Sequence, residues 1–502
     1  MTRPAMLQKV LIANRGEIAV RVARTLREMG IGSVAVYSDA DRDSLHVRVC
    51  DEAYHIGPAA AADSYLRADK IIDVARRAGC DGVHPGYGFL SENADFADAC
   101  EAHGIAFIGP PASAMRAMGL KTAARDLMAA AGVPIVPGGN ASTVEEGLAT
   151  SERIGYPVML KATAGGGGKG MRLVHKPDEL GHALERARSE AKKAFGDETV
   201  YIEKAIIQPR HVEIQVLGDK HGNMLHLFER DCSVQRRHQK VVEEAPCPAI
   251  DADIVHEMGE VAVKGAKAVG YFSAGTFEFL LAQDKSFYFL EMNTRLQVEH
   301  PVTELITGVD LVREMVRVAA GLPLELKQTH LERRGAAIEC RIYAEDPATG
   351  FLPSPGKITA LRTPSGPGVR DDSGAYQGCT ISANYDPLIS KLSVWAPTRA
   401  QAVERMRRAI SEYLVSGIRT NLAFHERLLE HPEFIAGEYD TGFIDRYRDQ
   451  LLTGTTLDGP ARAELAQAIA VAASEAASAS SATLEQGCGQ SPWLAAHRAA
   501  LR

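Results

Sequence analysis

The amino-acid sequence predicts an α/β protein with several domains. Its 502 residues are enough for about three domains of about 100–200 residues each. Hydrophobic residues make up 45% of the chain and charged residues 24%, which is typical of globular proteins. Near the N-terminus, short apolar segments alternate with helical patterns, as they do when helices join the strands of a parallel sheet.

The first 120 residues are expected to form one such α/β domain. The apolar run 9–13 predicts a buried strand, and the pattern 17–29 predicts a helix that ends at Gly30. A second strand is predicted at 34–37. A further helix and two further strands continue the alternation, in that order: 68–78, 82–84 and 106–108.

This first strand, turn and helix could instead belong to a nicotinamide-binding dehydrogenase. Asp39 follows the second strand, where dinucleotide-binding folds place the acidic residue that holds ribose. The glycine fingerprint of those folds would require glycine at positions 14, 16 and 19, whereas the chain has Asn14, Gly16 and Ala19. The sequence therefore favours a scaffold role for this domain.

Charge and cysteine content exclude several classes of protein. The chain carries 56 basic and 64 acidic residues, and its net charge of −8 does not favour nucleic acid as a partner. Its eight cysteines include no CxxC pair, as expected for reduced thiols. No signal peptide and no apolar stretch of about 18 residues is found, so we expect no membrane contact and a cytoplasmic location.

A glycine-rich segment predicts a phosphate-binding hairpin. The predicted strands 157–162 and 171–175 flank residues 165–170, which are five glycines and one lysine and leave consecutive backbone N–H groups accessible. A Walker A loop is excluded because Thr163 and Gly170 stand where that motif needs glycine and Ser or Thr. The alternative is a surface hairpin that binds no ligand.

Two later strand-like segments form an acidic hairpin. If its turn has four residues, Ala282 pairs with Phe287 and Glu278 lies opposite Glu291. Two facing carboxylates require a cation between them, and Asn293 would add an oxygen on the same face. The hairpin therefore predicts a magnesium or manganese site. The alternative is a register slip that turns one glutamate to solvent.

Two segments concentrate ionisable groups. In the first, Glu299 is a candidate general base, and three neighbours add further polar groups: Arg295, Gln297 and His300. The second contains four basic residues that could attract a small anion or could form a solvated face: Arg236, Arg237, His238 and Lys240.

Four long motifs lie at residues 12–18, 84–93, 236–246 and 291–301. Together with the glycine-rich loop, they closely resemble biotin carboxylase, an ATP-grasp enzyme. The resemblance extends from about residue 9 to about residue 445. Other ATP-grasp ligases, such as carbamoyl-phosphate synthetase, share the glycine-rich lid and the metal hairpin, but they are not expected to carry the RRHQK and HPGYGFLSEN motifs.

The resemblance implies a role for individual residues. ATP would be held by ten of them, four of which form an adenine-side strand at 203–206: Lys121, Lys161, Gly167, Gly168, Glu203, Lys204, Ala205, Ile206, His211 and His238. The metal, which also contacts the nucleotide, would be bound by Glu278, Glu291 and Asn293. Bicarbonate would be held by Lys240, Arg295, Gln297 and Val298. Glu299 would be the base and Arg341 the arginine beside biotin.

The resemblance also implies a mixed α/β and α+β architecture. It consists of a Rossmann-like domain at 1–120, an ATP-grasp domain at 121–334, and a biotin carboxylase C-terminal domain at 335–446. Within the ATP-grasp domain, residues 136–204 would form a mobile glycine-rich lid. An Ala/Ser-rich tail or linker would follow at 447–502.

The implied activity is ATP-dependent carboxylation of biotin with bicarbonate, through carboxyphosphate, as the first half-reaction of an acyl-CoA carboxylase such as those for acetyl-CoA or 3-methylcrotonyl-CoA. The chain contains no Met-Lys-Met motif, so the biotin would be attached to a carrier domain on another chain or segment. A carboxyltransferase subunit and a second copy of the chain are further expected partners. The alternative is a non-catalytic subunit that uses the fold only for assembly.

Overall fold

The computed structural model describes residues 6–141, 143–162, 172–195 and 200–453. Among the described residues, 6–452 belong to one compact unit. Gly167, Gly168 and the Ala/Ser-rich part of the predicted tail lie outside the described residues.

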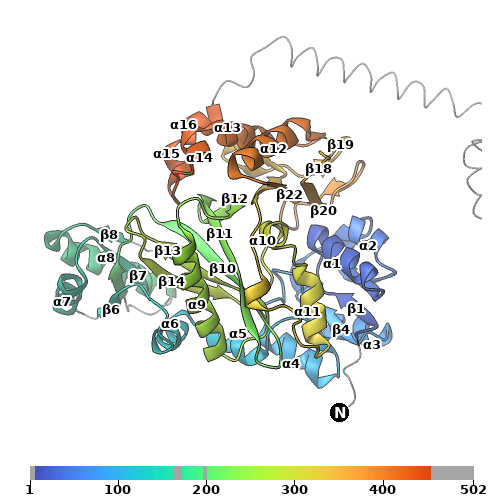
Figure 1. Ribbon diagram of the computed structural model, residues 1–502, viewed down its shortest axis with the longest axis horizontal. Helices are drawn as coiled ribbons and strands as arrows, with labels where there is room; N and C mark the ends of the chain where they lie inside the picture. The colour runs from blue at the N-terminus through green and yellow to red at the C-terminus, as the bar shows by residue number, and fades with distance from the viewer. Residues whose placement is uncertain (1–5, 142, 163–171, 196–199, 454–502) are drawn as a thin grey trace, which may run out of the picture. The chain divides into compact units, whose positions relative to one another are not determined.

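The N-terminal domain is built on a parallel sheet of five strands in the order β3-β2-β1-β4-β5 (Figure 1). The predicted parallel sheet is confirmed. β3 was not predicted, because it is a half-buried strand without a continuous apolar run. The strands are β1 (Lys9–Ile12), β2 (Gly32–Ser38), β3 (Glu52–Gly57), β4 (Gly82–His84) and β5 (Ala106–Phe107). The helices are α1 (Gly16–Glu28), α2 (Leu45–Val49), α3 (Ala68–Arg77) and α4 (Ala94–Ala102).

A second, smaller sheet contains the two strands predicted around the glycine-rich segment. Its four antiparallel strands have the order β6-β9-β7-β8. They are β6 (Gly138–Ala141), β7 (Val158–Ala162), β8 (Arg172–Val174) and β9 (Val200–Lys204). Two preceding helices are α5 (Ala112–Gly119) and α6 (Lys121–Ala130), and two helices pack on the sheet, α7 (Val144–Ile154) and α8 (Pro177–Phe195).

The central sheet has eight antiparallel strands in the order β14-β13-β10-β11-β12-β15-β22-β20. It continues across residue 334, where the sequence predicts a domain boundary, because Val242 of β12 pairs with Cys340 of β15. Its strands are β10 (Arg210–Gly218), β11 (Met224–Arg236), β12 (Gln239–Ala245), β13 (Ser273–Leu281), β14 (Phe287–Asn293), β15 (Ala336–Tyr343), β20 (Val369–Ser373) and β22 (Leu388–Ala396).

Helices cover both faces of the central sheet. On one face, α9 (Ala252–Ala268) lies across β10 and β11 and packs with Val216 and Phe277 (Figure 1). On the other face, α11 (Leu311–Ala319) packs with Leu217, which follows Val216 and therefore points the opposite way. The short helix α10 (His300–Thr307) contacts β11, β12, β15 and β22.

The C-terminal part adds a helical layer around a core that includes Phe424 and Leu451. Its helices are α12 (Arg399–Glu412), α13 (Leu422–Glu430), α14 (Pro432–Ala436), α15 (Phe443–Arg446) and α16 (Arg448–Thr453). Short strands form three two-stranded sheets: β16 (Glu345–Asp346) with β17 (Leu352–Pro353), β18 (Gly356–Lys357) with β21 (Thr380–Ile381), and β19 (Ala360–Arg362) with β23 (Leu414–Ser416).

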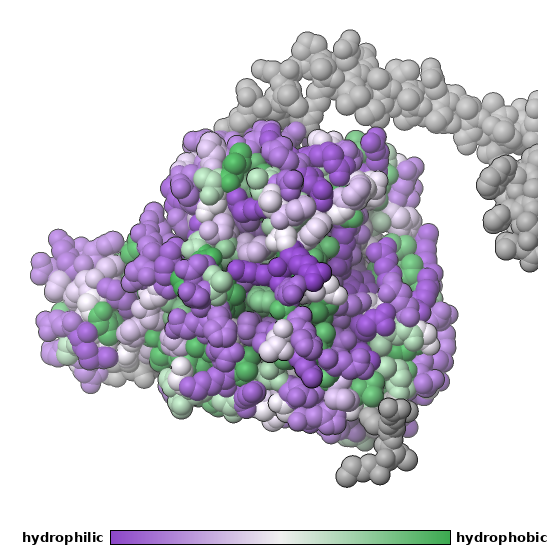
Figure 2. Space-filling view, viewed as in Figure 1, coloured by the Kyte–Doolittle hydropathy of each residue, from purple (hydrophilic) through white to green (hydrophobic). Residues whose placement is uncertain are grey.

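The visible surface is mainly polar, with apolar residues in small patches (Figure 2). None of the helices in the described part of the chain combines the length and the apolar character that a membrane crossing requires. The seven cysteines in the described part of the chain are all free thiols, as predicted.

Candidate active site

Strand alternation places carboxylates on one face of the central sheet. In β10, Val212 and Ile214 point into the core under α9, so Glu213 points to the opposite face. Its direct partner in β13 is Glu278, and both glutamates are buried. Two facing carboxylates in a buried sheet repel each other, so the site requires positive charge.

Lys240 of β12 supplies part of that charge. Its Nζ lies 2.6 Å from Glu213 Oε2, 2.8 Å from Glu278 Oε1 and 2.7 Å from Glu299 Oε1. Burial opposes the charge of Lys240, but the three carboxylates outweigh burial and hold its pKa well above the usual range. Lys240 therefore remains an ammonium group with all three of its hydrogens shared among carboxylates.

Arg230 of β11 is the second buried cation and was not predicted from the sequence. Its guanidinium donates to Glu213 at 2.5 Å, to Gln215 at 2.7 Å and to Gln297 at 2.6 Å. It is completely buried, and its position in a run of three charged residues, 229–231, inside a strand was the available signal. Arg230 fixes Gln297, which in turn donates to Glu278 at 2.8 Å.

Glu299, the predicted base, immediately precedes α10 and lies between two cations. Lys240 Nζ contacts its Oε1, and Arg341 of β15 donates to its Oε2 at 2.9 Å. Burial opposes ionisation of Glu299, but Lys240, Arg341 and Arg230 outweigh burial and lower its pKa strongly. Arg341 also donates to Glu243 at 2.6 Å, and burial raises the pKa of Glu243 to about 8.

The acidic hairpin has the predicted facing glutamates, but it reaches them by a different register. Phe287 pairs with Leu281, one residue earlier than the predicted Ala282, because the connection is one residue longer than expected. A bulge after Phe289 restores the alignment, so Glu278 is directly opposite Glu291. The bulge also keeps both Phe289 and Met292 in the core under α9.

Oxygen donors from this hairpin fit a hard divalent cation. Glu278, Glu291 and Asn293 share the face of the hairpin away from α9, and carboxylate and amide oxygens are the ligands preferred by Mg²⁺. Asn293 Nδ2 donates to Glu278 Oε1 at 2.8 Å, while Asn293 Oδ1 accepts from Arg295 at 2.7 Å. His211 Nε2 lies 3.0 Å from Glu278 Oε2. Burial opposes the charge of Glu278, but Lys240 and His211 keep its pKa well below the usual range.

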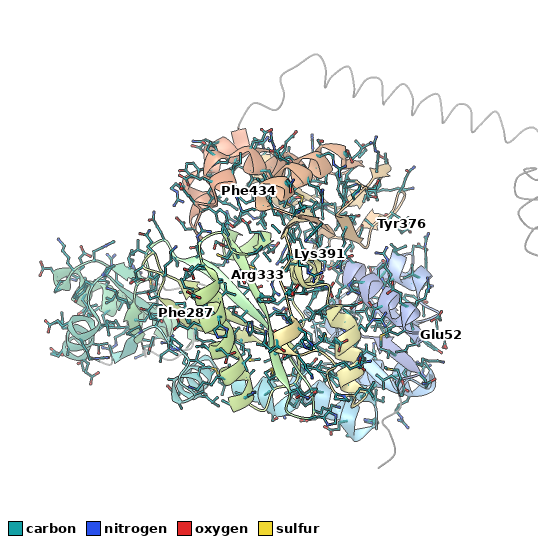
Figure 3. All side chains as sticks on the ribbon, viewed as in Figure 1. Glu52, Phe287, Arg333, Tyr376, Lys391 and Phe434 are labelled. Carbon is teal, nitrogen blue, oxygen red and sulfur yellow. The ribbon has the colours of Figure 1, made fainter. Side chains whose placement is uncertain are left out.

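A cavity of about 440 Å³ adjoins this network. Three predicted site residues line it, namely Arg295, Val298 and Arg341, and they are joined by Tyr87 and Gln239, which sequence reasoning missed. The carbonyl of Val298 accepts from Lys391 Nζ at 2.9 Å, and Lys391, labelled in Figure 3, is completely buried. The 84–93 motif contains Tyr87 and was the available signal for it.

The predicted ATP residues around the small sheet lie apart from the Lys240 network. Glu203 forms an ion pair with Lys161 and lies 3.4 Å from Arg125. Lys204 Nζ donates to two backbone carbonyls of the same unit. The adenine-side strand was predicted at 203–206, but β9 ends at Lys204 because its partner β7 begins at the residue opposite. Two further predicted ATP residues, Ala205 and Ile206, follow β9. Lys121 is the first residue of α6, and its side chain lies outside the described part of the structure.

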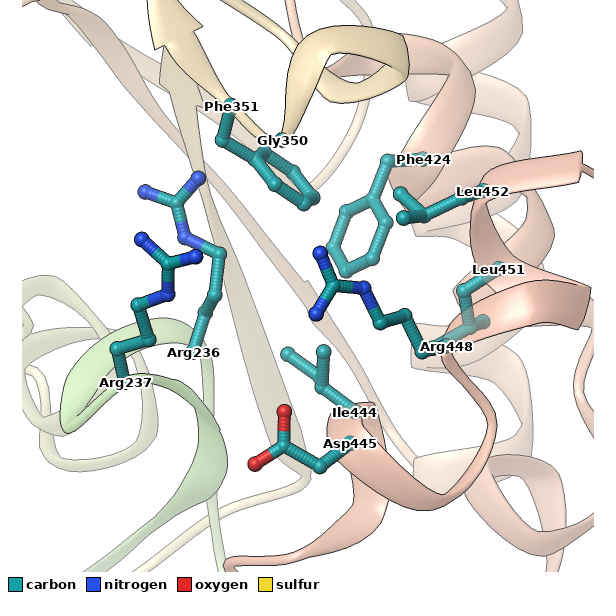
Figure 4. Close-up of a pocket in the computed structure, with 10 residues that line it drawn as sticks. All are labelled: Arg236, Arg237, Gly350, Phe351, Phe424, Ile444, Asp445, Arg448, Leu451 and Leu452. Carbon is teal, nitrogen blue, oxygen red and sulfur yellow. The ribbon is translucent and has the colours of Figure 1, made fainter.

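The predicted basic run does not form one anion-binding group. Arg236 lies 2.9 Å from Glu345 and stacks over the Phe351 ring at 4.1 Å. Figure 4 shows Arg236 and Arg237 lining a separate pocket with Phe351. His238 is exposed in the turn between β11 and β12, and of the four basic residues only Lys240 enters the carboxylate network within the described chain.

Three family models match successive parts of the chain. Biotin carboxylase, N-terminal domain, matches residues 6–115. Carbamoyl-phosphate synthase L chain, ATP binding domain, matches residues 121–327. Biotin carboxylase C-terminal domain matches residues 339–446.

Individual relatives match over most of the chain. Biotin carboxylase 1 of Bacillus subtilis is 54% identical over 88% of this chain and 99% of its own length. The mitochondrial methylcrotonoyl-CoA carboxylase subunit alpha of Dictyostelium discoideum is 53% identical over 89% of this chain, which spans 64% of that relative. One similar solved structure is the biotin carboxylase domain dimer of Hydrogenobacter thermophilus 2-oxoglutarate carboxylase, in complex with MgADP, ADP and bicarbonate. Its TM-score to this chain is 0.82 and its sequence identity is 47%. The match covers 89% of this chain and 99% of that one. The sequence, the fold and the arrangement of charged groups agree with these matches, and the chain belongs to the biotin carboxylase family.

Proposed function

We propose that this chain catalyses the ATP-dependent carboxylation of carrier-bound biotin with bicarbonate, the first half-reaction of a biotin-dependent acyl-CoA carboxylase. The single observation that carries the proposal is the position of Glu299, which lies between Lys240 and Arg341 beside a cavity. This arrangement pairs a proton acceptor with two cations. A binding-only subunit has no need of such a set.

Glu299 would remove the proton from bicarbonate, which is a poor nucleophile in its protonated form. In the ligand-free site its lowered pKa makes it a weak base. When bicarbonate oxygens accept hydrogen bonds from Lys240 and Arg341, these cations stabilise Glu299 less, and its pKa rises. Substrate binding would thereby activate the base at the moment it is needed. Arg295, Gln297 and Val298 complete the proposed bicarbonate pocket.

Glu278, Glu291 and Asn293 would hold Mg²⁺ or Mn²⁺, which supplies neutralising positive charge for the phosphates of ATP. The remaining predicted residues would bind the nucleotide: Lys121, Lys161, Gly167, Gly168, Glu203, Lys204, Ala205, Ile206, His211 and His238. The facing pair of Glu278, which is buried, and Glu291, which is half-buried, supports the assignment of the metal, together with Asn293 beside Glu278.

Attack of bicarbonate on the γ-phosphate would give ADP and carboxyphosphate. Carboxyphosphate would break down to CO₂ and phosphate, and the phosphate would take the ureido proton of biotin. Arg341 would then stabilise the enolate that attacks CO₂. The cavity beside Arg341 is the proposed entry for the biotin ring, and the glycine-rich lid would exclude water from carboxyphosphate.

The proposed partners follow from this reaction. Biotin would arrive on a carrier domain of another chain or segment, and a carboxyltransferase subunit would use the carboxybiotin. A homodimer is also proposed, and the dimer of the biotin carboxylase domain from Hydrogenobacter thermophilus supports it.

Phosphate release from MgATP tests the proposal. We expect release that requires bicarbonate and increases with added free biotin, compared with the same protein in CO₂-depleted buffer. Release that is indifferent to both compounds would indicate a different acceptor. An absence of release from folded, ATP-binding protein would favour a non-catalytic subunit and contradict the proposal.

A further inference from the structure

Three potential metal ligands meet on the face of the central sheet that is opposite to the Lys240 network. His226 of β11 pairs with Val216, whose side chain points toward α9, so His226 also points toward α9. His256 and Glu260 lie on α9, four residues apart and thus on one face of the helix. One ligand atom from each of these three residues lies within 4.8 Å of the other two.

The buried His226 side chain has a polar atom without a hydrogen-bond partner in the described structure. His226 is only 3% exposed, and its Nδ1 has no hydrogen-bond partner among the residues that the structure describes. Burying a polar nitrogen without a partner is unfavourable, so such a group calls for an explanation. The His226 ring contacts α9 at Gly259, where a Cβ atom would lie 2.6 Å from Nδ1. Gly259 therefore makes room for the imidazole between His256 and Glu260.

The chemistry of the three side chains favours a particular class of metal ion. Two imidazoles and one carboxylate are typical of zinc sites that keep a fourth position for water. The Mg²⁺ used with ATP prefers oxygen ligands and would not compete well for two imidazoles. We propose that His226, His256 and Glu260 bind Zn²⁺ or a related borderline divalent transition metal at a site separate from the active site.

The surroundings of His226 favour this assignment. Gln328 holds its backbone on both sides, because His226 N donates to Gln328 Oε1 and Gln328 Nε2 donates to His226 O, each at 3.0 Å. His256 and Glu260 are exposed, so their side chains can close around an ion entering from solvent. One fixed ligand and two adjustable ligands thus form the site.

Zinc titration of the untagged full-length protein in excess Mg²⁺, with a competing chromophoric chelator, tests the proposal. We expect one tight equivalent of Zn²⁺ in the wild-type protein. His256→Ala and Glu260→Gln should each weaken that equivalent by more than about tenfold, since even residues behind the ligands contribute about 10–100-fold. Both positions are exposed, so these variants should fold. Glu257→Gln, an exposed neighbour on α9, is the matched control and should bind like the wild type.

A gain-of-affinity variant sharpens the test. Glu260→His would present three imidazoles and should bind Zn²⁺ more tightly than the wild type. Zinc should also raise the Tm of the wild-type protein and of Glu257→Gln more than that of His256→Ala. Equal zinc affinity in the wild type, His256→Ala and Glu260→Gln would overturn the proposal, as would a wild-type protein that binds no zinc. Neither readout depends on carboxylase activity.

Discussion

Two clusters of charged side chains meet at the helix α10, and one of them is centred on a lysine, whereas arginines bridge the carboxylates of the other. In the Lys240 network, one ammonium contacts three glutamates, and Glu299 at the start of α10 is one of them. In the second, which we term the Arg370 cluster (Arg21, Glu304, Asp310, Arg370 and Asp372), guanidinium groups bridge the carboxylates, and Glu304 belongs to the same helix.

The difference separates a reactive site from a structural one. An ammonium is a compact charge with rotatable donors, so Lys240 can transfer its hydrogen bonds from Glu299 to an incoming anion. A guanidinium has a rigid planar set of donors, and each of the two in the Arg370 cluster holds two carboxylates at once. Arg370, for example, holds Glu304 and Asp372, each at 2.7 Å, and so joins the C-terminal part to α10. The comparison predicts that changes in the first cluster affect turnover and changes in the second affect stability.

The largest effect is expected for Glu299→Gln. Loss of the proposed base should lower biotin-dependent phosphate release per folded molecule by at least about 100-fold, the scale of general-base catalysis, while ADP binding stays close to wild type. Phosphate release and ADP titration provide the measurement. Glu304→Gln on the same helix is the control and should retain turnover per folded molecule. Near-wild-type turnover of Glu299→Gln would remove this residue from the role of base.

Glu304→Gln should instead destabilise the fold. Glu304 is 6% exposed at its side chain and accepts from Arg21, Arg370 and the backbone of Leu311. Removing its charge leaves the buried guanidinium of Arg21 and the half-buried guanidinium of Arg370 less compensated, and we expect the free energy of unfolding in urea to fall by about 3 kcal/mol. An unchanged unfolding curve, or a loss of turnover without a loss of stability, would contradict the division between the two clusters.

The pH dependence of stability should reveal Glu17, which lies 3.4 Å from Lys391 between the clusters. Burial raises the pKa of Glu17 to about 7 in the folded protein, from a usual value near 4.5. The unfolded chain therefore releases this proton first, and stability falls as pH rises from about 4.5 to about 7.

We expect Glu17→Gln to reduce this pH-dependent loss by about 2 kcal/mol, measured by urea unfolding at pH 5, 6, 7 and 8. Burial also raises the pKa of Glu339 to about 7, and Glu339 is present in both proteins, so their difference isolates Glu17. Parallel curves for the two proteins would show that Glu17 is ionised throughout this range.

The smallest effect is expected for Asp310→Asn. Asp310 caps α11 by accepting from the backbone of Arg313 at 2.9 Å, and it also pairs with Arg21 at 2.9 Å. Asparagine caps helices about as well as aspartate, and the Asp310 side chain is partly exposed, so the loss should stay below about 1 kcal/mol in urea unfolding. Asp310→Ala, which removes the cap as well, should cost about 1 kcal/mol more. Equal losses in both variants would assign the whole effect to the ion pair.

The sequence predicted the local parts of the fold and of the site. The parallel N-terminal sheet and the hairpin with its facing glutamates follow from strand alternation and turn composition. The predicted pairing of β13 with β14 was wrong by one residue from Phe287 up to Glu291, because the bulge after Phe289 was not recognised. The spacing of three between the core residues Phe289 and Met292 was its signal, since a regular strand spaces such residues by two.

The non-local parts could not be predicted by the same reasoning. Glu213 and Arg230 join the site only because β13, β10 and β11 are neighbours in the sheet, and strand order is not encoded in the periodicity of any one strand. The Arg370 cluster joins residues that are even farther apart in the sequence, since 283 positions separate Arg21 from Glu304. The family resemblance named most of the residues in the first cluster and none in the second.

The pairing of β12 with β15 across residue 334 has a consequence for protein engineering. Although the family models treat the residues on either side as separate modules, a chimera or truncation cut at this point would break a row of backbone hydrogen bonds. It would leave β12 as an exposed edge that invites aggregation, and it would separate Lys240 from Arg341. Recombination between relatives should therefore keep β12 and β15 in one exchanged block, with Leu451 included because it belongs to the C-terminal core.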